Sequence, residues 1–228
     1  MQARDAAIAA LCVPELASII AVVTWPSPTR DESGRPLSVF VANHEGVAEL
    51  SDENPDGVVI SGCHPLPSTD PLAFLPHESE RLNPSPDHGD NSYPLPWSRL
   101  SSFFTDRRSP DIAIVHTAGH YFPLENGHRG EHGSLDVIQS RAPLILSGAG
   151  VKSRGVVHDF ARLVDVMPTL AWAAGVDRSL LTGLDGSVLD HLVEPGAQNI
   201  IGLLWDGAHS GSLLELAQSG ELPGVARL

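Results

Sequence analysis

The sequence is poor in cysteine, in aromatic residues and in long apolar runs, and each shortage argues against a class of protein. Its two cysteines, Cys12 and Cys63, lie far apart and form neither a CxxC motif nor another metal-binding spacing. We therefore expect free thiols in a reducing compartment and no disulfide framework. No apolar run approaches the ~20 residues of a membrane-spanning helix, so the sequence predicts no membrane segment.

Positive charge is scarce as well. The chain has 14 Lys and Arg against 28 Asp and Glu, a formal net charge of −14. Acidic residues outnumber basic ones in both halves, so the acidity is not confined to a tail. Because such a surface repels phosphate backbones, we expect no nucleic-acid binding. Residues 1–12 contain an early acid and lack the apolar core of a secretory signal, which favours a cytoplasmic protein.

Glycine (21) and proline (19) are plentiful and separate short apolar segments. Residues 1–64 predict a helix followed by a portion rich in β-hairpins, with one turn at "NHEG". Residues 65–96 are dense in Pro, Ser and Asp and predict a loop excursion. Residues 97–195 predict a core that carries a His-Gly loop, and residues 196–228 predict a strand, an Asp-Gly turn and a helix.

Three apolar segments predict the fold class. Residues 112–115, 141–150 and 199–205 contain apolar runs without alternation, which is typical of parallel strands covered on both faces. Helical patterns precede, separate and follow these segments. The order of elements therefore predicts an α/β fold with a mainly parallel sheet flanked by helices.

Candidate ligand residues stand directly after the predicted strands. His120 ends the first, His128 and His132 lie in the glycine-rich loop that follows, and Asp206 comes after the last. The carboxyl ends of parallel strands are where α/β proteins bind ligands, and imidazole and carboxylate groups bind divalent metals. Each position also has an ordinary alternative. The histidines would be solvated loop residues or structural, and Asp206 would be a helix cap or turn residue.

Other acidic and histidine positions are interpreted as structural. Asp165 is a capping or surface acid in a helical segment that is interrupted or begins anew near Pro168. Residues 184–189, "LDGSVL", predict a turn. Asp87 and His88 are adjacent and could coordinate a metal, but their Pro-rich surroundings favour a loop role.

Four ordered segments resemble one known family. These are "DIAIVHTAGHYF", "GEHGSLDVIQSRAPLILSGAGV", "ARLVDVMPTLAWAAGV" and "LDGSVL". Together they resemble the C-terminal half of the alkaline phosphatase superfamily, in particular the type I phosphodiesterase/nucleotide pyrophosphatase group. In that group a strand leads into a Gly-x-His-Gly loop, and a second strand, a D-V-x-P-T-L helix and an L-D-G segment follow. The resemblance covers roughly residues 95–190.

The resemblance implies a metal-dependent hydrolase of phosphate mono- or diesters with a two-metal site, usually zinc. The loop histidine that binds metal in the family matches His132. The "WDG" segment resembles the family's first metal-binding motif and implies Asp206 as a second ligand. His128 and His120, the latter beside Thr117, would support the ligands or face a small phosphoester substrate.

The chain departs from the family in its order. "WDG" follows the C-terminal half instead of preceding it, and no nucleophile segment comes after it, so the catalytic residue is unknown. We expect a fragment of a longer polypeptide, with a permuted form or an inactive relative as alternatives. The functional alternatives are a catalytically inactive α/β module and a sulfatase or phosphomutase of the same superfamily. Nothing in the sequence indicates the oligomeric state.

Overall fold

The computed structural model describes residues 2–73, 79, 82–83, 86–120, 133–152, 154–205 and 210–228. The chain forms two compact units, Met1–Arg141 and Ala142–Leu228. Among the described residues, none of the helices is both long enough and apolar enough to span a membrane.

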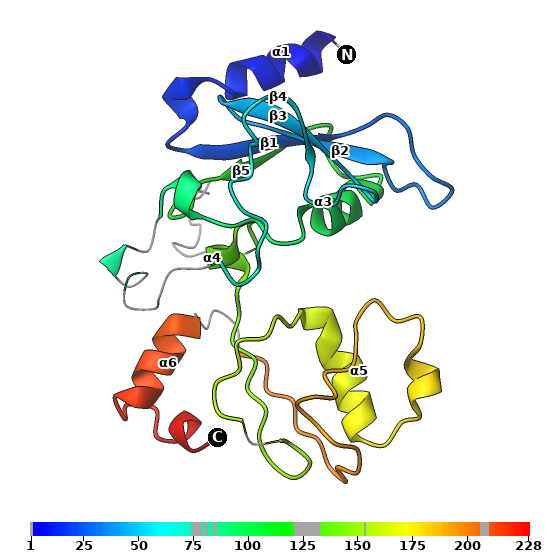
Figure 1. The fold of residues 1–228 in the computed structure, drawn as a ribbon, viewed down its shortest axis with the longest axis vertical. Helices are drawn as coiled ribbons and strands as arrows, with labels where there is room; N and C mark the ends of the chain where they lie inside the picture. Colours follow the sequence, from blue (N-terminus) through cyan, green and yellow to red (C-terminus); the bar gives the residue numbers. More distant parts are fainter. Residues whose placement is uncertain are drawn as a thin grey trace. The chain divides into compact units, whose positions relative to one another are not determined.

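The first unit is built on one five-stranded sheet with the order β4-β3-β2-β1-β5 (Figure 1). All four pairings between neighbouring strands are antiparallel. The strands are β1 (Ile20–Pro26), β2 (Ser38–Ala42), β3 (Gly46–Ser51), β4 (Val58–Gly62) and β5 (Ala113–His116). The predicted hairpin around "NHEG" is confirmed as β2 and β3, with Val41 opposite Ala48.

The predicted mainly parallel α/β fold is wrong. Of the three apolar segments that suggested it, only the first forms a strand, and this strand, β5, pairs antiparallel with β1 at a sheet edge. In residues 142–150 and 199–205 the structure has no strand, and Ile201 and Leu203 are 94% and 89% exposed. An uninterrupted apolar run signals burial on both faces but carries no information on the direction of the neighbouring strand.

The core of the first unit lies between the sheet and helix α3 (Pro96–Thr105). Trp97, Leu100 and Phe104 recur at spacings of three and four residues, so they share one face of α3 and pack against β1, β2 and β3. Helix α1 (Gln2–Leu11) lies against β1 on the other face of the sheet (Figure 1). The centre of β1 is consequently buried on both faces.

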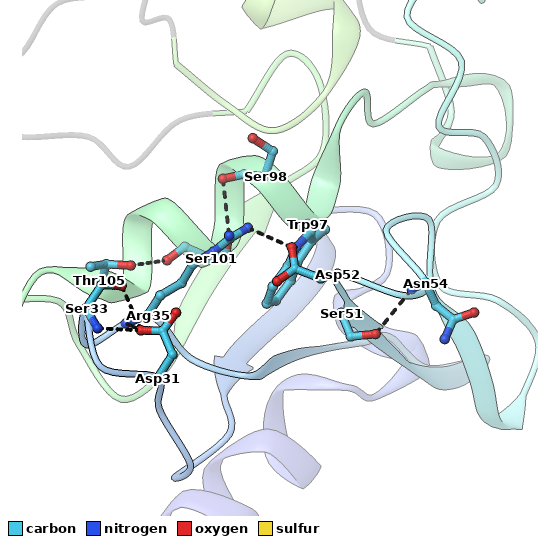
Figure 2. Close-up of polar contacts among 10 residues, drawn as sticks. All are labelled: Asp31, Ser33, Arg35, Ser51, Asp52, Asn54, Trp97, Ser98, Ser101 and Thr105. Atoms are coloured by element: carbon cyan, nitrogen blue, oxygen red, sulfur yellow. Dashed lines mark hydrogen bonds and ion pairs between the residues drawn. The ribbon is translucent and has the colours of Figure 1, made fainter. Parts of the chain in front are cut away.

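Polar contacts attach the β1–β2 loop to α3 (Figure 2). The Arg35 Nε atom donates to Ser101 Oγ at 3.0 Å, and the Arg35 guanidinium lies 4.7 Å from the centre of the Trp97 ring. The Trp97 indole N–H donates to Asp52 Oδ1 at 2.7 Å, and an Arg35 nitrogen lies 3.4 Å from the same oxygen. One arginine thus joins the β1–β2 loop, α3 and the residue that follows β3.

The second unit contains the helices α5 (Leu163–Ala173) and α6 (Ser210–Gln218). Helix α5 continues through Pro168, so no new helix begins there, and the chain leaves it at Gly175 with a φ of 85°. An antiparallel bridge between Val151 and Val193 holds two further segments together.

Asp165 has the structural role that the sequence suggested. One carboxylate oxygen accepts from the backbone N–H of Arg162 at 2.8 Å and caps α5, and the other accepts from the N–H of Ser187 at 2.8 Å. Thr169, one turn later, accepts from the N–H of Leu189 at 3.0 Å. The "LDGSVL" segment is therefore a strap that two side chains of α5 hold in place.

Candidate functional site

The candidate site of the first unit lies where β5 ends. His116 is the last residue of the strand and pairs with Ile20 of β1. The next residue, Thr117, is buried, and its backbone N–H donates to the carbonyl of Ile19 at 2.8 Å. A tight turn with Gly119 at a φ of 80° then brings the exposed His120 back over Thr117. The His120 imidazole therefore lies at the surface, next to the carboxyl end of β5.

The Thr117 hydroxyl determines the orientation of the His120 ring. Its oxygen lies 2.8 Å from the carbonyl oxygen of Ser18 and 2.9 Å from the Nδ1 atom of His120. A carbonyl only accepts, so both contacts form hydrogen bonds together only when the single hydroxyl proton of Thr117 goes to Ser18. The hydroxyl oxygen then accepts from His120, and the proton of the neutral ring sits on Nδ1.

This tautomer has a chemical consequence. With the proton on Nδ1, the Nε2 atom of His120 carries the lone pair, and the residue is exposed. A ring held through one nitrogen and open at the other is the arrangement of metal-binding and base histidines. Thr117 itself is not poised as a nucleophile, because its proton is already donated to a backbone carbonyl.

The predicted ligand edge requires a correction. The prediction rested on several parallel strands ending at one edge of a sheet, but β5 runs antiparallel to β1, so its carboxyl end lies beside the amino end of β1. His128, His132 and Asp206 fall outside the described residues. Only His120, of the four candidate ligand and substrate-facing residues, is placed by the structure.

The described residues do not form a complete metal site. Among the described residues, no group of three or more His, Cys, Asp or Glu side chains could hold one ion. A catalytic zinc usually needs three protein ligands. His120 could supply one nitrogen, and its chemistry suits zinc, but the described residues do not complete a ligand set around it.

His88, which the sequence placed in a loop, is a structural residue. Its Nε2 atom lies 2.7 Å from the carbonyl oxygen of Pro65, and its Nδ1 atom lies 2.6 Å from the hydroxyl of Tyr93. Both ring nitrogens are therefore occupied by the protein, which leaves no lone pair for a metal. The neighbouring Asp87 precedes a short 3-10 helix, His88–Asp90. The loop interpretation of this pair is confirmed.

Burial changes the acid–base properties around this histidine. Burial lowers the pKa of His88, and the carbonyl of Pro65 and the charge of Glu45 only partly oppose this effect. Burial also raises the pKa of Tyr93, and the charge of Asp136 adds to the rise. The ring and the phenol are thus both neutral at physiological pH, which fits a hydrogen bond from the tyrosine to the histidine.

The segment that follows the His-Gly loop is firmly attached to α3. Arg99 donates from its guanidinium to the backbone carbonyls of Ser134 and Leu135. Asp136 is 1% exposed and accepts from the N–H of Gln139 at 2.9 Å, which caps the short helix α4 (Val137–Ser140). Nothing in the sequence pattern indicated Arg99 as an anchor, because the contacts join residues distant along the chain.

Comparison with protein-family models, with curated proteins and with solved structures yields no match for this chain. The likeness to the alkaline phosphatase superfamily consequently stays a prediction from the four sequence segments.

Proposed function

We propose that this chain contributes to a metal-dependent phosphoester hydrolase of the type I phosphodiesterase/nucleotide pyrophosphatase kind. The observation that carries the proposal is the orientation of His120 by Thr117 at the end of β5. The Gly-x-His-Gly loop with His132 follows within the same connection. His132 would supply a nitrogen ligand to zinc, His120 would support the site or face the ester, and the metal would polarise the ester and stabilise its leaving oxygen.

An acidic chain can bind a phosphate ester only when a bound metal offsets its negative charge. A chain with a formal net charge of −14 repels phosphate esters at long range. Bound divalent cations reverse the sign of the local field and are often the largest charges in such a site. Zinc would therefore have to bind before the ester.

A zinc titration by calorimetry tests this proposal on the full chain. We expect binding that His132→Ala abolishes and that His120→Ala weakens by about 10- to 100-fold, as expected when the supporting residues of a metal site are lost. His158→Ala is the matched control, because His158 is exposed and lies in the second unit. Binding that is indifferent to both first-unit histidines would contradict the proposal.

Turnover is tested separately with bis(p-nitrophenyl) phosphate, p-nitrophenyl phosphate and p-nitrophenyl sulfate in the presence of zinc. We expect hydrolysis of a phosphate ester that depends on His132. Hydrolysis of the sulfate alone would favour the sulfatase alternative within the same superfamily. Zinc binding without turnover of any of the three esters would leave a metal-binding protein and overturn the hydrolase assignment.

A non-catalytic binding module is the second candidate. It is favoured by the exposure of Ile201, Leu203 and Leu204, whose side chains are 94%, 89% and 89% exposed. Apolar side chains this accessible are typical of surfaces that associate. Light scattering over a concentration series tests this role. A zinc-independent, saturating increase in mass that Leu203→Ser prevents would support it.

A further inference from the structure

A recess in the second unit has no part in the proposed hydrolase. Its volume is about 400 Å³, within the usual range of small-molecule sites. Lys152, Trp172, Arg178, Asp190, His191 and Glu194 contribute to its lining, together with the apolar residues Val193 and Pro195. Charged groups of both signs thus stand beside an aromatic ring and an aliphatic wall.

Backbone hydrogen bonds hold the frame of the recess. The N–H of Lys152 donates to the carbonyl of Leu192 at 2.8 Å, and the N–H of Glu194 donates to the carbonyl of Gly150 at 2.7 Å. The N–H groups of Gly196 and Ala197 both donate to the carbonyl of Ala173, at the end of α5. The wall that carries Val193 is therefore fixed both to the Lys152 segment and to the helix.

Most charges around the recess already have protein partners. Arg178 lies 5.5 Å from the centre of the Trp172 ring and donates to Asp190 Oδ2 at 2.7 Å. His191 Nε2 lies 3.2 Å from Asp159 Oδ2. Arg178 therefore pairs with one oxygen of the Asp190 carboxylate while its guanidinium lies over the Trp172 ring.

Lys152 differs from Arg178, the other basic side chain of the recess, in what it contacts. Its ammonium donates to the carbonyl oxygen of Asp190 at 2.9 Å, a neutral acceptor. An ammonium has three donors, and this bond uses one of them. Lys152 is also the one lysine of the sequence. It can therefore offer a charge-assisted hydrogen bond to an incoming anion.

We propose that this recess binds a small organic carboxylate, with the carboxylate on Lys152 and an apolar body against Val193, Pro195 and the Trp172 ring. A monoanion matches the single ammonium with spare donors. A phosphate dianion would meet the nearby carboxylates of Asp190 and Glu194, which line the same recess. The apolar wall requires a ligand larger than acetate, because an ion alone would leave that wall uncovered.

The test uses phenylacetate as the probe and phenylacetamide as its neutral counterpart. The indole N–H of Trp172, assigned with Trp172→Phe, is followed by two-dimensional NMR on the full chain. We expect a saturable shift with phenylacetate, and Lys152→Gln should weaken binding by roughly 10- to 100-fold, the equivalent of one charge-assisted hydrogen bond. Arg154→Gln is the matched control, because Arg154 is exposed and outside the lining.

A second readout needs no variant. An N-hydroxysuccinimide acetate labels the single lysine, and the α-amino group serves as the internal reference in the same sample. Phenylacetate should slow labelling of Lys152 and leave the α-amino group unaffected. Equal binding of phenylacetamide, an equal loss in Arg154→Gln, or unprotected Lys152 at saturating phenylacetate would each overturn the proposal. Zinc is absent from both readouts, so their result is independent of the hydrolase assignment.

Discussion

The Nδ1 atom of His88 lies 2.6 Å from the hydroxyl oxygen of Tyr93, inside the first unit, where Tyr93 is 1% exposed. Since Nε2 of His88 faces the carbonyl of Pro65, that nitrogen carries the ring proton, and Nδ1 accepts from the tyrosine. Asn43 Nδ2 stands 3.5 Å from the same Nε2 atom; two donors facing each other do not form a hydrogen bond. The pair therefore specifies a neutral imidazole.

This neutral imidazole predicts a loss of stability in acid. Burial lowers the pKa of His88 in the folded state below its value of 6.5, so the unfolded chain binds the proton more readily. The free energy of unfolding should decrease as the pH falls below about 6.5. Each unit of pKa depression is equivalent to about 1.4 kcal/mol.

Urea unfolding between pH 7.5 and 5, followed by tryptophan fluorescence, measures this effect. Glu45 and His44 also face His88, with opposite effects on its charge, so His88→Gln provides the direct comparison. His88→Gln should show a flatter pH profile than the parent protein, and His158→Gln, at an exposed position of the second unit, is the matched control. An equal slope in the parent protein and in His88→Gln would contradict the interpretation.

Removal of the Tyr93 hydroxyl should cost stability at neutral pH. Tyr93→Phe leaves the ring in the core but deprives the Nδ1 atom of His88 of its donor, and an unsatisfied buried acceptor costs about 1–3 kcal/mol. A double-mutant cycle with His88→Gln isolates the contribution of the pair. The two substitutions should be less than additive, and strict additivity would mean that the 2.6 Å contact contributes nothing.

The planar guanidinium of Arg35 should contribute to stability beyond the contribution of its charge. Arg35→Lys keeps the charge but removes the planar group over Trp97 and the Nε donor to Ser101 (Figure 2). We expect a loss of about 1–2 kcal/mol in the free energy of unfolding. Arg107→Lys, at an exposed position after α3, is the matched control and should change stability by less than about 0.5 kcal/mol.

Asp165 should dominate the stability of the second unit. Asp165→Ala removes the α5 cap and the bond to Ser187, so we expect a loss of about 2–4 kcal/mol. Asp185→Ala, an exposed acid in the same strap, is the control. Hydrogen exchange at the N–H of Ser187 reports the effect directly, since that amide should lose its protection only when Asp165 is replaced.

Gly186 provides an independent test of the strap. A Cβ atom at this position would overlap the carbonyl oxygen of Val164 and approach the backbone N–H of Asp165. Gly186→Ala should therefore destabilise the second unit by more than about 2 kcal/mol, since backbone rather than a flexible side chain must move. Thermal unfolding measures the loss of stability. Gly89→Ala serves as the comparison, because a Cβ atom at Gly89 would meet no neighbouring atom. Equal melting temperatures would contradict the close approach.

The local elements of this protein could be predicted because their causes are local. The spacing of Trp97, Leu100 and Phe104 specifies the buried face of α3, and Pro96 suits its first turn. "NHEG" specifies the turn between β2 and β3, because the Asn43 side chain accepts from the N–H groups of Glu45 and Gly46. A cap at Asp165 follows from the preference of aspartate for the first turn of a helix.

The direction of the strands and the partners of the polar groups were decided only by the tertiary structure. The apolar run that forms β5 would suit a parallel or an antiparallel neighbour equally. Its actual partner, β1, lies some ninety residues earlier in the sequence. The same holds for Thr117, which receives its acceptor from Ser18, and for His88, which receives its partners from Pro65 and Tyr93. A sequence pattern records which side chains avoid water, whereas the groups they meet are determined by how distant segments pack.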